Sequence, residues 1–497
     1  MVFKRVSGVI AVLVMLVSAP ALAEVVITLK NGVKITVPVN REDIATIELD
    51  GDAAPVAAPE KAAAAPASRP VAPSPKRQAP EKQAPPKPEP SESKPEVAVA
   101  PEPRATQPKK EAPAKKVVGL PEGSSFRSGA FVPKRPDGGP SRVVRIGPGL
   151  DYERPSEYAR DAMDGDLIEI EGGTYIDDFA VWKASNITLR GVNGRPHLKA
   201  EGSPSNGKAI WVFAGDFVTV ENIEFSGAKV RDMNGGGIRY EGLHLTVRDS
   251  YFHHNQTGIM TVNRPGLVVE IENSEFAHRI PDSGRAHAIY IGTSDRLTVR
   301  NSYFHNNNVG HQIKTRAAVN EITYNRIVDE EGSSSYLIDL SNCGTSYIIG
   351  NVLQQSRRTE NYTAITYGPE GCKGRPKGLY VINNTFINDR HSGNFLKNYS
   401  PTPAVMKNNI VVGGGRFVSG NATEQNNVIA TRFKFRDRDA WDLRPMPGSA
   451  AVDAGTAPGM AGDFDLTPKK EPGFPDAAPP RQVSGAIDAG AFEATSN

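Results

Sequence analysis

Cysteine is scarce in this sequence. The 497 residues include only two, Cys343 and Cys372, so the chain can form one internal disulfide at most. In an oxidising compartment the two residues can pair, and otherwise they are two small buried side chains. The sequence leaves both interpretations open.

Long hydrophobic runs are absent after the first residues. Residues 1–23 begin with Lys4 and Arg5, continue with an apolar run over residues 9–17 and end in Ala-Leu-Ala. This pattern is typical of a secretory signal peptide cleaved before Glu24, because an uncleaved membrane anchor needs a longer apolar run. We expect a periplasmic or secreted protein with no transmembrane segment after cleavage.

An excess of positive charge is missing from the larger part of the chain. The whole chain has a formal net charge of +2, but residues 138–497 carry −3. General nucleic-acid binding depends on summed positive charge. We therefore predict that this protein has no nucleic-acid partner.

Two short segments precede the larger part. Residues 24–51 contain VVITL and KITVPV on either side of Asn31-Gly32, which favours a hairpin turn, and IATIEL could add a third strand. Residues 52–137 are rich in Pro, Ala, Lys and Glu and cannot bury enough apolar surface to fold, which predicts a disordered, extended linker. The linker and the small β module could contact the cell wall or envelope, and equally the linker could only solubilise the chain.

A repeat occupies most of residues 138–497, after a strand and a short helix that can cap a sheet edge. Its core is a β-branched residue, a polar residue, Asn or Asp, and an aromatic or aliphatic residue in sixth place, as in VENIEF, VRDSYF, IENSEF and VRNSYF. We expect the sixth side chains to stack internally and the Asn, Asp and Ser side chains to form ladders at a turn. The predicted sixth positions are residues 192, 225, 252, 276, 304, 327, 353, 386 and 410.

A second alternating strand lies upstream of most copies, as in GGIRYE, TGIMTV, HAIYIG, GHQIKT, YLIDLS and TAITYG. Two or three short strands per repeat, separated by turns rich in Asn and Gly, predict an all-β fold, a single-stranded right-handed parallel β-helix. A β-propeller would need longer repeats with antiparallel strands and hairpin turns.

These coils, with the closing segments DLRPMPGSAAVDAG and SGAIDAGAFE, resemble the pectate-lyase-like superfamily of secreted β-helix proteins. The resemblance covers roughly residues 140–497 and implies the fold. It is less specific for activity, because this scaffold carries lyases, hydrolases, epimerases, esterases and inert spikes.

The isoleucines of the upstream strands predict how the coils stack, since neighbouring strands lie about 4.8 Å apart. The residues that directly follow the isoleucines form an outward row, which contains Tyr290, Lys314 and Asp339. The residues three places after the isoleucines form another row, which aligns Gly292 with Arg316. The residues two places before the isoleucines form a third row, which superposes His287, His311 and Tyr336. Alternation gives this row the inward phase, but it lies at the start of the strand, where the chain leaves a turn. The aligned isoleucines are Ile238, Ile259, Ile289, Ile313, Ile338 and Ile365.

The column over these coils contains groups suited to proton abstraction beside a sugar carboxylate. Residues 277–316 hold six Lys or Arg against two Asp. Lyase or epimerase chemistry on a uronate needs a cation for the developing charge and a base for the proton, and elimination also needs an acid for the leaving oxygen. The predicted partner is therefore an acidic polysaccharide.

Roles follow from side-chain chemistry. Arg316 or Arg285 could hold the carboxylate, since arginine binds it bidentately. His311 or Lys314 could be the base, Tyr336 or Tyr290 the proton donor, and Asp339 could orient Lys314 or His311. The predicted catalytic set is His287, His311, Lys314, Arg316, Tyr336 and Asp339, and the predicted substrate contacts are Tyr290, Arg239, Arg279 and Arg285.

Structural roles compete with each assignment. His287 and His311 could cap strand starts by bonding to turn carbonyls, Lys314 and Asp339 could form a surface ion pair, and the tyrosines could be surface aromatics or sugar-stacking platforms. The remaining histidines of the repeat resemble a turn ladder and lack compact metal-ligand spacing, so no metal site is predicted. These are His253, His254, His278 and His305.

Two other functions stay open. A glycoside hydrolase needs two carboxyl groups, for which Asp329, Glu330, Glu331 and Asp339 are the candidates, although the first three fall in a segment expected to be a solvated loop. A non-catalytic exopolysaccharide- or wall-binding module could use the same Arg and aromatic face. No cofactor is predicted, and calcium is unsupported because no column of outward Asp is evident.

Overall fold

The computed structural model describes residues 10–15, 22–29, 34–40, 142–280 and 286–494. The chain divides into two units, one within Met1–Ala114 and one within Lys115–Asn497. In the first unit β1 (Ile10–Met15), β2 (Leu22–Leu29) and β3 (Lys34–Asn40) form an antiparallel sheet in which β2 lies between β1 and β3.

The β2–β3 pair flanks residues 30–33, where the sequence predicts a hairpin turn. β1 lies within the predicted signal peptide, whose cleavage stays a prediction. The possible third strand IATIEL and the predicted linker over residues 52–137 fall outside the described residues. Among the residues that are described, no helix is both long and apolar enough to cross a membrane.

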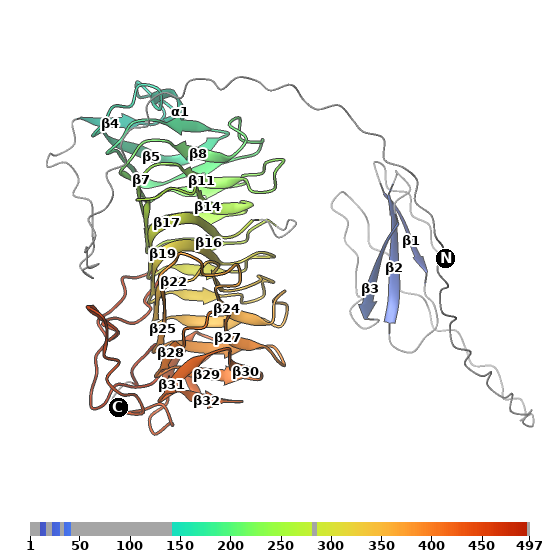
Figure 1. Cartoon of the computed structure of the whole chain (residues 1–497). Coiled ribbons are helices and arrows are strands. Elements are labelled where there is room, and N and C mark those ends of the chain that lie inside the picture. Colours follow the sequence, from blue (N-terminus) through green and yellow to red (C-terminus); the bar gives the residue numbers. More distant parts are fainter. Residues whose placement is uncertain (1–9, 16–21, 30–33, 41–141, 281–285, 495–497) are drawn as a thin grey trace, which may run out of the picture. The chain divides into compact units, whose positions relative to one another are not determined.

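The second unit is a parallel β-helix, as the repeat predicts. Successive coils pair through parallel strands, so the ribbon in Figure 1 descends coil by coil from β4 at the top to β32 at the bottom. Three strand columns run along the stack, and we call them sheets A, B and C. The long strands β5 (Leu167–Ile176) and β7 (Thr188–Lys199) run from sheet B into sheet C, while β17 (Ile289–Arg300) and β19 (Ile313–Thr323) run from sheet A into sheet B.

The other strands each belong to one column. Sheet A contains β6 (Ala180–Trp182), β8 (Ala209–Phe213), β11 (Gly236–Tyr240), β14 (Thr257–Thr261), β21 (Ile338–Leu340), β24 (Thr363–Tyr367), β27 (Asn394–Asn398) and β30 (Arg416–Ser419). Sheet B contains β4 (Val143–Ile146), β9 (Val218–Glu221), β12 (His244–Arg248), β15 (Val268–Glu272), β22 (Gly344–Ile349), β25 (Lys377–Ile382), β28 (Ala404–Lys407) and β31 (Ala422–Gln425). Sheet C contains β10 (Glu224–Ser226), β13 (Tyr251–His253), β16 (Glu275–Ala277), β18 (Tyr303–His305), β20 (Arg326–Val328), β23 (Val352–Gln355), β26 (Thr385–Asn388), β29 (Ile410–Gly413) and β32 (Val428–Ala430).

An internal stack of aromatic rings confirms the predicted sixth position of the repeat. Phe225, Phe252, Phe276 and Phe304 lie one above another with ring centroids 4.7–5.0 Å apart and interplanar angles of 9° or less. All four side chains are buried, so each coil adds its phenylalanine to a continuous apolar core.

The first and last repeats were aligned wrongly from the sequence. Phe225 pairs with Leu198 rather than with Val192, because β7 turns a corner that adds residues between its two halves. At the other end Phe386 pairs with Val411, not Ile410. The last repeat is therefore MKNNIV.

The corner between sheets B and C explains the polar positions of the repeat. The third residue takes a left-handed conformation, with φ of 44° at Asn301, 50° at Asn383 and 54° at Asn408. Asn, Asp and Gly tolerate this region better than other residues. The fourth residue points inward, where a column of serines gives way to a column of asparagines, as the sequence predicts.

This asparagine ladder is closed by its own hydrogen bonds. The Asn325 amide donates to Asn351 Oδ1 at 3.0 Å, Asn351 to Asn384 at 2.9 Å, Asn384 to Asn409 at 3.1 Å and Asn409 to Asn427 at 2.9 Å. The first four of these side chains are fully buried. A buried amide is tolerated only when its donors and acceptors are paired, which the identical side chain on the next coil provides.

A short helix lies at the N-terminal end of the coil stack, and the C-terminal segment packs along its side. The predicted N-terminal helix is a single turn, α1 (Pro155–Tyr158). The C-terminal segment contains the hairpins β33 (Phe435–Asp437) with β34 (Asp442–Pro445) and β35 (Met460–Ala461) with β36 (Phe464–Asp465). It returns along the coils, where the Asn383 amide donates to Asp488 O at 2.8 Å and the Asn301 amide to Asp476 O at 2.8 Å.

We predict that Asn384→Ala lowers the free energy of unfolding by roughly 3 kcal/mol, because it leaves buried groups on two neighbouring coils without partners. Asn421→Ala is the control, since that exposed amide makes one surface bond to Pro401 O. Urea denaturation of both variants measures the difference. Equal stabilities would contradict a structural role for the ladder.

Candidate functional site

The register of sheet A brings the predicted outward row together. Ile289, Ile313 and Ile338 pair in the predicted order, so Tyr290 lies beside Lys314 and Lys314 beside Asp339. The neighbouring row departs from the prediction. Gly292 forms a bulge between β17 and β19, and Arg316 is paired with Thr293 instead.

The three rings of the strand-start column stack as the alignment predicts. His287 and His311 lie 4.7 Å apart with an interplanar angle of 6°, and His311 and Tyr336 lie 4.7 Å apart at 14°. The hydrogen bonding differs from the expected capping of carbonyls. His287 Nδ1 accepts the backbone N–H of His311 at 3.0 Å, and His311 Nδ1 accepts that of Tyr336 at 3.1 Å.

These bonds determine the tautomer of each imidazole. Because Nδ1 accepts a backbone N–H, the proton of the neutral ring is on Nε2. His311 Nε2 faces Asp339 Oδ2 at 3.5 Å. Burial lowers the pKa of His311 to about 4 despite the nearby Asp339 carboxylate, and it lowers the pKa of His287 well below its usual value. In this arrangement the one basic lone pair of His311, on Nδ1, is engaged by the Tyr336 N–H and is not free to accept a proton from a substrate.

Asp339 is the buried centre of the site. It is 1% exposed, and its Oδ2 accepts the Lys314 ammonium at 2.8 Å and the Ser341 hydroxyl at 2.8 Å. Its Oδ1 accepts the Thr366 hydroxyl at 2.9 Å. Burial raises the pKa of Asp339, but His311, Lys314 and Ser341 together outweigh burial and leave it below its usual value.

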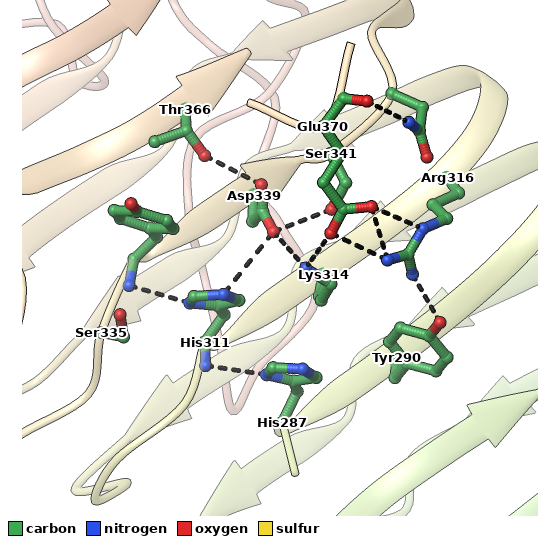
Figure 2. Close-up of polar contacts among 12 residues, drawn as sticks. His287, Tyr290, His311, Lys314, Arg316, Ser335, Asp339, Ser341, Thr366 and Glu370 are labelled. Carbon is green, nitrogen blue, oxygen red and sulfur yellow. Dashed lines mark hydrogen bonds and ion pairs between the residues drawn. The ribbon is translucent and has the colours of Figure 1, made fainter. Parts of the chain in front are cut away.

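Glu370 is a site residue that the sequence analysis missed. Its carboxylate accepts Lys314 Nζ at 2.9 Å and Arg316 Nη2 at 2.7 and 2.9 Å (Figure 2). The Glu370 side chain is 41% exposed, whereas Lys314 and Arg316 are 12% and 19% exposed. Two cations therefore converge on one carboxylate that solvent reaches.

Arg316 is also held from below by an aromatic ring. Its guanidinium lies 5.1 Å from the centroid of the Tyr290 ring and donates from Nη1 to the Tyr290 hydroxyl. This contact fixes the plane of the guanidinium fork, the geometry that binds a carboxylate through two nitrogens.

A disulfide joins Cys343 to Cys372 beside this cluster, with a Cα–Cα distance of 5.2 Å. It fastens the loop of Glu370 to the turn after β21, where the Glu370 N–H also donates to Ser341 O at 2.9 Å. The position of Glu370 two residues before Cys372, two coils from Lys314, was the available sequence signal. The excess of Lys and Arg over residues 277–316 is thus partly neutralised by carboxylates from later coils.

Some predicted substrate contacts lie elsewhere. Arg279 is 3% exposed, and its guanidinium donates to the carbonyls of Gln256, Asn308 and Val309, so it braces a turn inside the protein and faces no solvent. Arg239 lies in the outward row three coils from Lys314 and binds Glu241 at 2.6 Å. Arg285 lies outside the described residues.

The carboxylates proposed for a hydrolase do not form a pair facing substrate. Asp329 was expected in a solvated loop but is fully buried, where it accepts hydrogen bonds from Ser334 and Thr359 and burial raises its pKa to about 6. Glu330 accepts the Tyr303 hydroxyl, and Glu331 is 83% exposed near Arg358.

A separate cavity of about 410 Å³ lies between the B–C corner and the C-terminal segment, away from the Lys314 cluster. Its charged lining includes Arg248, Glu272, Arg300 and Lys469.

In the Lys314 cluster, the lysine already occupies the position between Asp339 and Glu370. A metal ion bound by both carboxylates would have to displace its ammonium. We place the candidate site at the Lys314–Arg316–Glu370 cluster, which solvent reaches through the Glu370 carboxylate.

Comparisons with known proteins identify the fold. A family model described as a right-handed beta helix region matches residues 172–353 and 244–433. The structure of pectate lyase Pel9A is similar at a TM-score of 0.52 and 17% identity, covering 72% of this chain and 97% of that chain. No curated protein sequence matches significantly.

Two further solved structures resemble the chain more loosely. An alginate lyase from Paenibacillus sp. str. FPU-7 aligns at a TM-score of 0.35 and 14% identity, covering 54% of this chain and 94% of that one. The tailspike protein gp49 of Acinetobacter baumannii bacteriophage Fri1, a capsular polysaccharide depolymerase, aligns at 0.33 and 11%, covering 59% and 62%.

The buried His311 predicts a pH-dependent contribution to stability. Between pH 6.5 and about 4 the unfolded chain binds a proton at this imidazole that the folded chain does not. Stability should therefore fall as pH drops through this window, by on the order of 3 kcal/mol from this group.

His311→Gln keeps an acceptor for the Tyr336 N–H and should remove that part of the pH slope in urea denaturation between pH 7 and pH 4. His391→Gln, on an exposed loop, controls for the loss of an imidazole. An unchanged slope in His311→Gln would contradict the buried neutral ring.

Proposed function

This chain belongs to the right-handed β-helix family, and from that premise we propose that it acts on an acidic, uronate-containing polysaccharide by β-elimination or by C5 epimerisation. The observation that supports the proposal is the convergence of Lys314 and Arg316 on one half-exposed carboxylate, that of Glu370. A sugar carboxylate has the same charge and geometry. Glu370 thus occupies the position that a uronate would take.

Each residue has a role in this proposal. Arg316, held by Tyr290, binds the uronate carboxylate and stabilises the negative charge that develops when the C5 proton leaves. Lys314 takes that proton in its neutral form. Tyr290 protonates the departing O4 in elimination, while in epimerisation no C–O bond breaks and a proton returns to the opposite face of C5. Asp339 positions Lys314 from the buried side.

Only the neutral form of Lys314 can act as the base, and protonation keeps that form scarce near neutral pH. Burial lowers its pKa, but Asp339 and Glu370 together outweigh burial and leave it above its usual value. Displacement of Glu370 by substrate exchanges one anion for another, so the lysine stays charged over most of the neutral range. Turnover should therefore increase as pH rises above neutrality.

The same observation favours a second function. A lysine held as a cation beside an arginine is a competent anion-binding pair without any proton transfer. A non-catalytic module that binds acidic exopolysaccharide would need only Lys314, Arg316 and the nearby Tyr336 ring. The two functions therefore make different demands on Lys314. Catalysis needs it to take a proton, whereas binding needs only its positive charge.

The test uses the full chain and a panel of uronic-acid polymers that includes pectate, with a neutral glucan as control. Elimination produces the ultraviolet absorbance of a new C4–C5 double bond, and epimerisation exchanges the C5 proton with deuterated solvent. Lys314→Met and Lys314→Arg should each reduce turnover about 100-fold or more, while Lys314→Arg keeps polymer binding. Arg239→Met, three coils away, should retain both.

Each other outcome is decisive. Polymer binding with neither absorbance nor exchange supports the binding module and rejects the enzyme. Full turnover in Lys314→Arg rejects Lys314 as the base, and no binding to any acidic polymer rejects both functions.

Glu370 should compete with the substrate carboxylate. Replacement by glutamine removes the carboxylate that Arg316 and Lys314 share, while Lys314 keeps Asp339. Polyuronate affinity should therefore rise by roughly fivefold, equivalent to about 1 kcal/mol for a partly exposed ion pair. Glu360→Gln makes the same charge change on an exposed turn and should leave affinity unaltered. A weaker affinity in Glu370→Gln would show that Glu370 orients the cations instead of competing.

A further inference from the structure

Sheet C presents a second group of ionisable side chains, on a different face from the Lys314 cluster. Two strands have the sequence Tyr-Phe-His, with the phenylalanine inward and the other two side chains outward. His253 Nε2 lies 2.8 Å from Glu224 Oε1, and His305 Nε2 lies 2.8 Å from Glu275 Oε1. In both cases the glutamate comes from the preceding coil, so the structure contains two copies of one His–Glu pair.

The second ring nitrogen distinguishes the copies. His305 Nδ1 accepts the Asn306 amide at 3.1 Å, and this amide nitrogen also donates to Glu330 while its carbonyl accepts the Glu331 N–H. Because an amide nitrogen cannot accept a proton, His305 must have its proton on Nε2. The His305 lone pair is therefore not available at Nε2.

His253 has no such restriction. Its Nδ1 lies 2.7 Å from Nδ1 of His254, an imidazole that can donate or accept. When His254 accepts, the proton of His253 lies on Nδ1 and the lone pair at Nε2 is free. A histidine that ligates a metal through one nitrogen commonly donates its other N–H to a neighbouring acceptor in this way.

A third donor is present only in the first copy. β7 places His197 opposite Glu224, and His197 Nε2 lies 3.4 Å from Glu224 Oε1. The equivalent position before Glu275 is Tyr251. The ligand atoms of His197, Glu224 and His253 lie within 4.8 Å of one another, whereas zinc ligands about 2.0–2.1 Å from the ion are roughly 3–3.5 Å apart.

The site is accessible to solvent. The three side chains are 15–23% exposed. Two neighbouring cations are engaged elsewhere, Lys199 with Glu201 at 2.7 Å and Arg195 with Asn222 at 3.2 Å.

We propose that His197, Glu224 and His253 bind a divalent transition-metal ion of the zinc type, with the remaining position open to water or an exogenous ligand. Two imidazoles and one carboxylate are a ligand set that suits zinc, with three protein ligands and one open position. The Ser226 hydroxyl, 2.6 Å from His197 Nε2, rotates away when the ion binds. The site lies on sheet C and does not depend on the function proposed for sheet A.

The test is titration of tag-free, chelator-treated full-length protein with Zn²⁺ and, separately, with Co²⁺, whose visible absorption reports imidazole and carboxylate ligation. The wild type should bind one ion. His197→Gln should weaken binding at least tenfold, and His305→Gln, which alters the copy without a third donor, should leave it unchanged. Unchanged melting temperatures of the metal-free variants verify that both fold.

Three outcomes would overturn the proposal: no saturable binding by the wild type, equal loss in both variants, or binding that His197→Gln does not weaken. Equal loss would mean that several histidines share the ion without a defined site, since the rings of His254, His278 and His305 lie next to one another on successive coils.

Discussion

The position of each side chain in this β-helix depends on the parallel pairing of one coil with the next. The pairing is maintained at the B–C corner, where a left-handed residue turns the chain and a buried Ser or Asn bonds to its counterpart one coil away. A shift by one residue would place the inward phenylalanines outside and break every bond of the ladder at once. The coils therefore keep one register, and side chains far apart in the sequence become neighbours about 4.8 Å apart.

This stacking has an electrostatic consequence. Like charges at the same position of consecutive coils would lie side by side and repel each other. The row of sheet A that contains Tyr290, Lys314 and Asp339 avoids this, because a phenol, an ammonium and a carboxylate follow one another. Burial of the Asp339 carboxylate is costly unless donors surround it, and Lys314, Ser341 and Thr366 provide them. The buried carboxylate in turn keeps Lys314 positioned and charged. Glu370 completes the arrangement from a loop that the Cys343–Cys372 disulfide fastens.

The sequence prediction failed where the chain departs from the period of the repeat. Periodicity placed the central coils correctly, including the phenylalanine stack and the superposition of His287, His311 and Tyr336. It misplaced Val192 and Ile410, where a longer corner and consecutive asparagines leave the alignment ambiguous. It gave no position for Arg279 or Glu370, because loops between strands do not follow the repeat.

The sequence by itself determined the fold class, the register of the central coils and the column of chemically capable residues, because these follow from a period that recurs in every coil. Only the tertiary structure decided which groups face each other and in what protonation state. The proton of His311 is placed by a backbone N–H of the next coil, and the charge of Lys314 is stabilised by carboxylates one coil and two coils away. Burial and hydrogen bonding act through space, and a linear pattern contains the residues but not the distances between them.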